Sequence, residues 1–229
     1  WCNLRCVFCQ NWEISHKGTG QEVGPDEIAG MMLALQAQGC HNINLVSPSH
    51  VTAQIISAVE IAARRGLRLP LVYNTGGYDS PEALALLDGI IDIYMPDMKY
   101  GDSDIARRYS SVRDYVRVNR AAVREMHRQV GDLVLDEHGI AQRGLLVRHL
   151  VLPENLAGTE QVLDFLAREI SPNTYLNLMD QYRPCYRARE HPPLDLPLQA
   201  EEFETALVLA ARYGLQRLDS EQERRRLAL

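Results

Sequence analysis

Apolar residues along the chain recur with two alternating spacings, one typical of amphipathic helices and one typical of short buried strands. Between Pro25 and Gly39, apolar side chains stand three and four residues apart and predict a helix that begins at the proline. The short apolar run at residues 42–46 follows and predicts a strand. This order repeats along the chain, which is typical of parallel βα units.

Further apolar runs predict strands at residues 69–74, 90–95, 145–152 and 175–179. Helices are predicted at residues 53–65, 81–87, 114–130, 159–170 and 200–213. A short run at 133–135 and a turn at 136–139 precede the strand at 145, and residues 180–198, rich in proline and charge, predict a loop. The polar tail at residues 220–229 is expected to fray.

The predicted fold class is α/β, with helices connecting parallel strands in a partial or open barrel. A doubly wound sheet is the alternative, because periodicity does not distinguish the two closures. No shift in composition separates a second domain, so residues 1–219 are expected to form one domain. In either fold we expect the functional groups at the carboxyl ends of the strands.

Three of the five cysteines, Cys2, Cys6 and Cys9, form the spacing C-x3-C-x2-C. Thiolates are soft ligands that bind zinc, copper(I) or iron–sulfur clusters. Electron-transfer cubanes usually have four cysteine ligands, so three close thiolates with no clear fourth would leave one iron open to an outside molecule. The alternatives are a Cys3His zinc site with His16 or His41 as the fourth ligand, and cysteines that are simply buried as small apolar residues.

Composition narrows the choice of partners and cellular setting. Cys40 and Cys185 stand alone; we expect the first to be buried and the second to be a surface thiol. An odd number of cysteines, grouped in this way, favours a reducing, cytoplasmic setting. Lys and Arg total 24 against 30 Asp and Glu, a net charge of -6, without basic blocks or long apolar runs. Neither nucleic acid nor a membrane is an expected partner.

The cysteine spacing, with Phe8 before the third cysteine, resembles the signature of radical S-adenosylmethionine (SAM) enzymes. The following Gln10-Asn11 is similar to the activating enzymes of glycyl radical enzymes, in particular to the branch that resembles the pyruvate formate-lyase activating enzyme. The resemblance covers most of the chain and is carried by Cys2 to Trp12 and residues 41–46, 74–78, 97–100, 148–150 and 177–184.

This resemblance implies a partial (β/α)6 barrel whose first strand leads into the cysteine loop; because the chain begins at Trp1, we expect that strand upstream of it. It also implies a [4Fe–4S] cluster held by Cys2, Cys6 and Cys9. SAM would bind the open iron and, on reduction, yield a 5′-deoxyadenosyl radical that abstracts hydrogen. The implied partners are a low-potential electron donor, such as flavodoxin or ferredoxin, and a glycyl radical enzyme.

Two other functions stay open from the sequence. Modification of a small molecule or peptide is the alternative within the radical SAM enzymes. A non-catalytic zinc-binding interaction domain is the alternative outside them.

Polar residues follow several predicted strands, where a barrel collects functional groups. Asn74 and Thr75 precede two glycines that would let the backbone approach a ligand, although a simple turn explains them as well. Asp97 and Lys99 alternate in an extended segment and are expected to face the barrel mouth, as part of a SAM site or as an ordinary ion pair. Arg148, within an apolar strand, needs a partner, and a carboxylate of the protein or of the cofactor is the natural one.

One residue and one segment differ from what a cofactor site would suggest. His149 points away from Arg148 and is expected to be structural. Residues 47–50 read Ser-Pro-Ser-His where the activating enzymes carry a Gly-Gly-Glu that holds the amino group of SAM. The residues expected to bind the cofactor are Phe8, Asn11, Ser47, Asn74, Thr75, Asp97, Lys99, Arg148 and Gln181.

Overall fold

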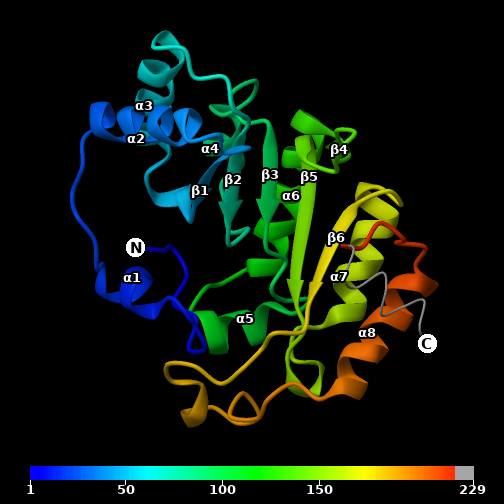
Figure 1. Ribbon diagram of the computed structural model, residues 1–229. Helices are drawn as coiled ribbons and strands as arrows, with labels where there is room; N and C mark the ends of the chain where they lie inside the picture. The colour runs from blue at the N-terminus through cyan, green and yellow to red at the C-terminus, as the bar shows by residue number, and fades with distance from the viewer. Residues whose placement is uncertain (220–229) are drawn as a thin grey trace.

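A mostly parallel sheet forms the centre of the computed structural model, which describes residues 1–219 (Figure 1). The parallel strands lie in the order β1 (Ile43–Val46), β2 (Leu71–Thr75), β3 (Ile93–Pro96), β5 (Ala141–Leu150) and β6 (Tyr175–Met179). The short β4 (Val134–Leu135) pairs antiparallel with the start of β5. Among the described strands, β1 and β6 do not pair with each other, so the sheet is an open, partial barrel of the predicted α/β class.

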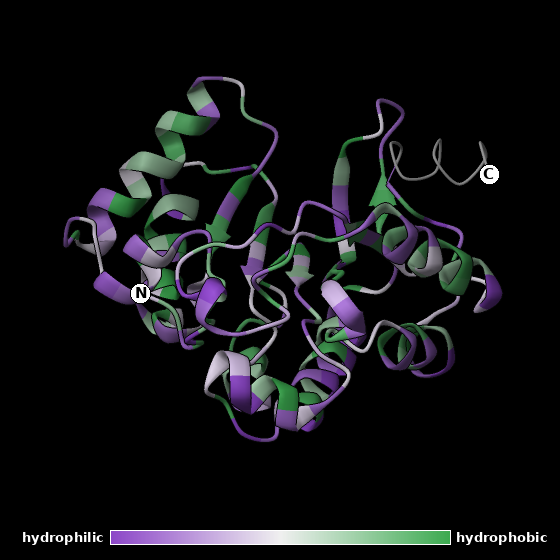
Figure 2. Ribbon diagram, turned by 90° about the horizontal axis from the view of Figure 1, so that it is seen from below, coloured by the Kyte–Doolittle hydropathy of each residue, from purple (hydrophilic) through white to green (hydrophobic). Residues whose placement is uncertain are grey.

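Most helices connect the strands and flank the sheet, whereas α1 (Trp12–Lys17) and α5 (Ser103–Ser110) lie beyond the carboxyl ends of the strands (Figure 1). The other helices are α2 (Pro25–Ala37), α3 (Thr52–Arg64), α4 (Pro81–Ala85), α6 (Tyr115–Val130), α7 (Thr159–Phe165) and α8 (Ala200–Arg212). A π turn at Leu166–Ile170 prolongs α7, and short 3₁₀ turns lie at Pro48–His50 (η1), Pro153–Asn155 (η2) and Ala188–Glu190 (η4). Hydrophobic and hydrophilic residues mix along the helix ribbons, as expected of amphipathic helices (Figure 2).

Alternation along the strands divides the apolar residues between two sides of the sheet. Leu71 and Tyr73 belong to the main core beneath the helices, whereas Val72 packs with Ile93 and Leu133 in a separate small cluster. The partly buried Met95, Ala141, Leu146 and Tyr175 pack against that cluster. The concave side is therefore apolar near the start of the strands. Its polar residues lie near the carboxyl ends of the strands.

The carboxyl ends of the parallel strands point to the side where the N-terminal segment, α5 and residues 180–199 lie (Figure 1). A second core fills this side. It joins Leu4, Val7 and Phe8 of the cysteine loop to residues of α5 and of the segment after β6, among them Tyr109, Tyr182, Ala188 and Leu194. The cysteine loop is thus packed across the strand ends.

Most predicted elements are confirmed within a few residues, and two helices were missed. The missed helices are α1 and α5, and β5 begins at Ala141 rather than at residue 145. Cys40 is only partly buried, because it lies in the exposed turn between α2 and β1, so its predicted burial was wrong. The tail at residues 220–229, predicted to fray, lies outside the described residues.

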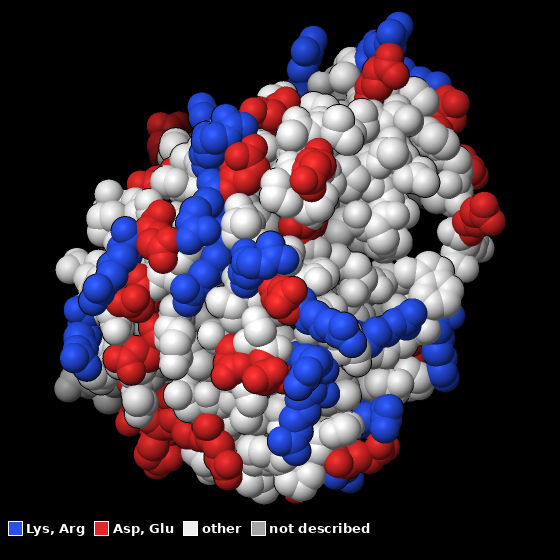
Figure 3. Space-filling view, turned by 180° about the vertical axis from the view of Figure 1, so that it is seen from behind, with Lys and Arg blue, Asp and Glu red and all other residues white. Residues whose placement is uncertain are grey.

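Charged side chains of both signs are interspersed on the face that is turned away in Figure 1 (Figure 3). Several charged side chains of the described residues form exposed pairs; Arg128, for example, lies 2.5 Å from Asp88 and 2.8 Å from Glu125. Exposed pairs of this kind contribute little to stability. None of the helices in the described part of the chain is both long enough and apolar enough to cross a membrane.

Candidate functional site

The three clustered cysteines face one cavity of about 300 Å³ at the carboxyl ends of the strands. Cys6 is buried, at 7% exposure, and Cys2 and Cys9 are partly buried; all three are thiols. The cavity is also lined by residues from the ends of β1, β2, β3 and β5. An N-terminal loop and the sheet therefore form one site, although they are far apart in sequence.

Helix α5 holds the cysteine loop in place through its last carbonyl groups. The N–H of Arg5 donates to the Ser110 carbonyl at 3.0 Å, and the N–H of Val7 donates to the Tyr109 carbonyl at 2.9 Å. Carbonyls in the last turn of a helix have no partner within the helix, so the loop satisfies them. Ser111, with φ 57°, turns the chain away at this point. The side chain of Ser110 also contacts Cys6, at 2.9 Å between Oγ and Sγ.

The segment after β6 covers the other side of the cysteine loop. The N–H of Arg187 donates to the Val7 carbonyl at 2.9 Å, and the Tyr182 hydroxyl donates to the Leu194 carbonyl at 2.5 Å. The rings of Phe8 and Tyr182 pack edge to face, with centroids 6.0 Å apart. The predicted loop at residues 180–198 is therefore an ordered cover on the site, with a 3₁₀ turn inside it.

An ion cluster of the buried Asp97 and the partly buried Lys99 and Arg148 lies beside the cysteines. Lys99 Nζ is 2.5 Å from one carboxylate oxygen of Asp97, and an Arg148 terminal nitrogen is 2.7 Å from the other. The same arginine donates to the Asn74 side-chain oxygen at 2.8 Å. Burial acts to raise the pKa of Asp97, but the two cations hold it below its usual value. Burial acts to lower the pKa of Lys99, and the Asp97 carboxylate raises it overall.

This cluster confirms what the sequence implied about Arg148 and His149. Arg148 has the carboxylate partner that a guanidinium in an apolar strand requires. His149 points to the opposite side and is fully buried, with Nδ1 2.6 Å from the Met98 carbonyl and Nε2 3.0 Å from the Thr159 hydroxyl. Asp97 and Lys99 do form an ion pair, but it is buried at the cavity rather than exposed at the surface.

Two residues of α6 that the sequence did not single out hold the strand ends in place. The Tyr115 hydroxyl lies 3.0 Å from the Gly76 carbonyl and accepts from the Lys99 N–H at 3.0 Å. One turn later, Asn119 donates to the carbonyls of Gly77 and Asp97 at 2.9 and 3.0 Å. The sequence did contain a signal for this role. Tyr115 and Asn119 are polar, stand four positions apart and lie on a helix face that is otherwise apolar.

A second buried network fixes Thr75. Its hydroxyl donates to Asp79 at 2.7 Å and lies 3.0 Å from the Ser49 hydroxyl, and Tyr73 donates to the other Asp79 oxygen at 3.1 Å. Burial raises the pKa of Asp79, against the hydrogen bonds that lower it. This network ties η1, which follows β1, to the end of β2. Asn74 and Thr75 are strand residues, so the alternative of a simple turn was wrong.

The remaining predicted residues lie around the same opening. Asn11 and Ser47 line the first cavity, and Ser47 has a left-handed backbone with φ 53°. Phe8 and Gln181 line an adjoining cavity of about 220 Å³. Both cavities share the residues Cys6, Cys9, Asn11, Asp97, Lys99 and Arg148. The structure thus brings every predicted site residue to one two-part opening.

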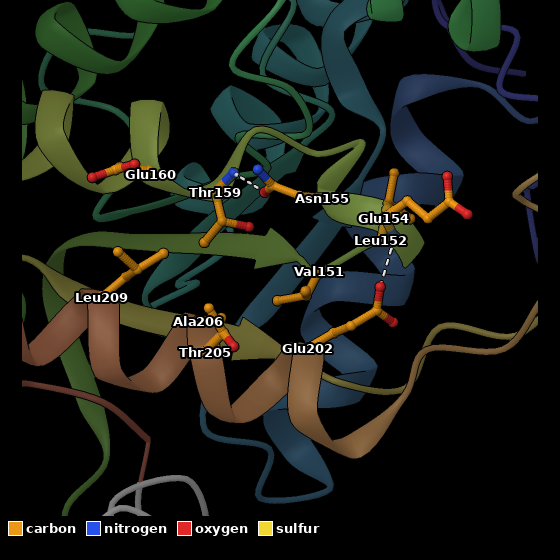
Figure 4. Close-up of a pocket in the computed structure, with 10 residues that line it drawn as sticks. All are labelled: Val151, Leu152, Glu154, Asn155, Thr159, Glu160, Glu202, Thr205, Ala206 and Leu209. Atoms are coloured by element: carbon orange, nitrogen blue, oxygen red, sulfur yellow. Dashed lines mark hydrogen bonds between the residues drawn. The ribbon is translucent and has the colours of Figure 1, made fainter.

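A larger cavity, of about 450 Å³, lies away from the cysteines, between the end of β5, the start of α7 and the face of α8 (Figure 4). Aliphatic side chains such as Val151 and Leu209 line it together with hydroxyls and the carboxylates of Glu154, Glu160 and Glu202. Glu202 accepts from the Glu154 N–H at 2.6 Å across its mouth. Its lining has no thiol, imidazole or cation.

The comparisons with known proteins identify the family. A family model described as the radical SAM superfamily matches residues 1–166. The chain belongs to the radical SAM superfamily. An uncharacterized protein of Methanocaldococcus jannaschii is 32% identical over 222 residues, which is 93% of this radical SAM chain and 61% of the relative. The chain thus spans 61% of that relative's length.

Solved structures agree with this radical SAM fold. A radical SAM methyltransferase from Sphaerobacter thermophilus is similar with a TM-score of 0.63 and 14% identity, over 93% of this chain and 61% of that one. The FeFe-hydrogenase maturase HydG from Carboxydothermus hydrogenoformans is similar with a TM-score of 0.60 and 13% identity, over 99% and 54% of the two chains. At these identities the likeness shows the fold alone.

Radical SAM enzymes use a [4Fe–4S] cluster and SAM, and the residues of the site fit both. Three soft thiols face one cavity, which polar side chains from the strand ends also line. Burial raises the pKa of the Cys6 thiol to about 11, so binding a cluster must displace its proton. Among the described residues, the buried Arg148 Nε has no hydrogen-bond acceptor, which leaves a donor for a ligand.

The zinc alternative is less well supported than the cluster. His16 lines the cavity, but His41 is exposed and does not. Within residues 1–219, no three or more His, Cys, Asp or Glu side chains, the three cysteines included, are grouped so as to hold a metal ion, so their spacing favours neither zinc nor a cluster. Because the family match covers the cysteine segment itself, it favours the cluster.

Proposed function

We propose that this chain is the catalytic part of a radical SAM enzyme that holds a [4Fe–4S] cluster through Cys2, Cys6 and Cys9 and abstracts hydrogen from a carbon of its substrate. The observation that carries the proposal is that all three thiols face the cavity lined by Asp97 and Arg148. When bound, the cluster and SAM supply a 5′-deoxyadenosyl radical. The chain supplies the ligands, the orientation and the exclusion of water.

Arg148 is assigned to the carboxylate of SAM. One terminal nitrogen of Arg148 contacts both Asp97 and Asn74, and the buried Nε has no hydrogen-bond acceptor among the described residues. The Nε–H is therefore a single free donor, and a charge-assisted hydrogen bond from it to a carboxylate suits the ligand. Asn11, Ser47, Thr75 and Lys99 surround the same cavity with polar groups.

The adjoining cavity is assigned to the adenosine part of SAM. Phe8, Leu150, Met179 and Tyr182 give it an apolar lining, and Gln181 lies at its exposed rim. Polar and charged groups, among them Asn11 and Lys99, line the rest of this cavity, and apolar surface beside convergent polar groups is typical of small-molecule sites. The two cavities share Cys6 and Cys9, so a molecule that spans them passes the proposed cluster.

The test uses anaerobically reconstituted protein with dithionite and SAM. We expect about four irons and four sulfides per chain, and release of 5′-deoxyadenosine and methionine. Cys6→Ala should abolish both cluster loading and cleavage. Cys40→Ala and Cys185→Ala, which remove partly buried thiols outside the cavity, should leave both intact. A wild-type protein that loads iron and sulfide yet forms no 5′-deoxyadenosine contradicts the proposed activity.

We propose that the substrate is a glycine residue of a partner protein, from whose α-carbon hydrogen is abstracted. The basis is the set of motifs that resemble the activating enzymes. The support lies in the Asp97 and Lys99 pair and in the Asn74 and Thr75 segment, which all line the cavity. Residues 47–50, Ser-Pro-Ser-His, stand where those enzymes carry the Gly-Gly-Glu segment and are the departure from their pattern. Incubation with a glycyl radical enzyme such as pyruvate formate-lyase should produce a glycyl radical signal in electron paramagnetic resonance. Release of 5′-deoxyadenosine without a glycyl radical signal would favour a small molecule or a peptide as the substrate instead.

A further inference from the structure

A chain of two hydroxyl groups ends on the sulfur of Cys6. Ser110 Oγ lies 2.9 Å from Cys6 Sγ, and Tyr100 Oη lies 2.7 Å from Ser110 Oγ. Both hydroxyls come from segments far from Cys6 in sequence, the end of α5 and the segment after β3. Neither residue was singled out by the sequence, because its contact with the thiol depends on the tertiary fold.

The direction of these hydrogen bonds follows from the number of protons. A cysteine that binds a metal is a thiolate and has no proton to donate, so Ser110 must donate to Cys6. A hydroxyl has a single proton. Since that of Ser110 is used on the sulfur, the Tyr100 hydroxyl must donate to Ser110. The two bonds then point the same way, toward the sulfur, and polarise each other.

Water does not compete with this arrangement. Ser110 is 0% exposed, Tyr100 is 1% exposed and Cys6 is 7% exposed. A hydrogen bond in a site closed to water is electrostatically stronger than one at the surface. The backbone of α5 fixes the distance as well, because the Ser110 carbonyl accepts from the Arg5 N–H next to Cys6.

We propose that Tyr100 and Ser110 are positioning residues that raise the reduction potential of the cluster by donating a relayed hydrogen bond to the Cys6 thiolate. Reduction adds negative charge to the cluster and its sulfur ligands. A donor to the sulfur stabilises the reduced form more than the oxidised form, so it makes the cluster easier to reduce. The inference rests on the proposed cysteine ligands, but not on the identity of the substrate.

Ser15 provides a built-in comparison. Its hydroxyl lies 3.2 Å from Cys9 Sγ but also 2.9 Å from the Asn11 carbonyl of its own helix turn. A carbonyl accepts only, so the single proton of Ser15 is engaged there. Ser15 therefore has no proton of its own for the Cys9 sulfur. The same serine-to-alanine change should matter at Ser110 and matter little at Ser15.

The experiment is a redox titration of the reconstituted cluster, without SAM, followed by electron paramagnetic resonance. Ser110→Ala should lower the equilibrium constant for one-electron reduction about tenfold, which corresponds to a potential about 59 mV lower. Ser110→Thr keeps the hydroxyl and should restore most of the potential. Ser15→Ala and Ser103→Ala should not shift it; Ser103 lies at the other end of α5, where its hydroxyl accepts from the Val116 N–H.

Iron and sulfide content separates this inference from the proposed function. If wild-type protein binds no cluster, the cysteine assignment fails and the relay fails with it. If wild type loads and Ser110→Ala leaves the potential unchanged, or shifts it no more than Ser15→Ala does, the relay alone is wrong. If Ser110→Ala holds no cluster, Tyr100→Phe decides, because it keeps Ser110 and removes only the outer donor. A Tyr100→Phe potential equal to that of wild type would then overturn the relay.

Discussion

At the scale of single residues, Asp97 sets the charge balance of the cavity. One buried carboxylate is shared by two cations, Lys99 and Arg148, so the group carries a net positive charge beside the three cysteines. A thiolate cluster and the carboxylate of SAM are both negative, and the excess cation is suited to them. Asn74 orients the arginine without changing the charge.

We predict that Arg148→Ala lowers the free energy of unfolding by about 2 kcal/mol. Breaking a buried ion pair completely typically costs about 3–5 kcal/mol of stability. The loss should be smaller here, because Asp97 keeps Lys99 as a partner. SAM affinity should fall about tenfold, by about 1.4 kcal/mol, because the carboxylate ligand loses its donor. Urea unfolding and calorimetric SAM titration measure the two effects. Arg65→Ala, which breaks the exposed pair with Asp26, should change stability by less than about 1 kcal/mol. Equal losses in the two variants would contradict the prediction.

His149 makes stability depend on pH in a predictable direction. Burial lowers its pKa from 6.5 to about 4, although the Met98 carbonyl opposes this by accepting from Nδ1. Between these two values the unfolded chain binds a proton that the folded chain does not, so stability falls as the pH is lowered. The loss between pH 7 and pH 5 should be about 2 kcal/mol.

His149→Gln should abolish this part of the pH dependence, because glutamine offers a donor and an acceptor but does not titrate. The measurement is urea unfolding of both proteins at pH 7 and pH 5. His138→Gln, at an exposed histidine, should leave the dependence as in wild type. A His149→Gln protein that loses as much stability as wild type would show that other groups are responsible.

At the scale of elements, tertiary contacts rather than local pattern decide how the site is assembled. The helices and strands with clear periodicity were predicted, and so were the residues at the strand ends. Helix α5 was not, because its eight residues include only Ile105, Ala106 and Tyr109 as apolar members. Its role depends on Arg5 and Val7, about a hundred residues earlier, and such long-range pairs leave no periodic trace in one sequence.

Gly77 shows how closely the elements approach. Its φ is +75°, and a Cβ here would lie 2.2 Å from the Asp97 carbonyl oxygen and 2.3 Å from Asn119 Nδ2. The two glycines after β2 were expected to let the backbone approach a ligand. At Gly77 the close approach is to β3 and α6 instead, so the residue is required for joining the strand ends.

Gly77→Ala is therefore predicted to destabilise the protein by about 3 kcal/mol or more, since positive-φ strain and a backbone clash act together. Gly214→Ala is the matched control. Gly214 has the same φ of +75°, and a Cβ added there would meet no atom within 4 Å, so only the strain of about 1 kcal/mol applies. Urea unfolding of the two variants compares them directly. Similar losses would mean that the Asp97 backbone yields to the added methyl group.

At the scale of the whole molecule, the cysteine loop connects three regions that are distant in sequence: α5, the ordered cover at residues 180–198 and the strand ends. The open sheet is completed by packing on this side rather than by closure of the barrel. A cluster bound to Cys2, Cys6 and Cys9 would fix the loop from within. Its binding energy then adds to the stability of the regions in contact with the loop, but not uniformly to the fold.

Removal of the cluster should therefore loosen one side of the molecule. Ligands that bind only the folded state stabilise it, so chelation should lower the melting temperature. Hydrogen exchange should quicken at the N–H groups of Arg5, Val7 and Arg187, which hold the loop to α5 and to the cover. Amides in α3, which packs on α2 away from the loop, should keep their protection. Untreated Cys6→Ala should show the same hydrogen exchange as chelated wild type. Chelation should not change the exchange of this variant further. Uniform loss of protection through α3 would instead mean that the cluster stabilises the fold as a single unit.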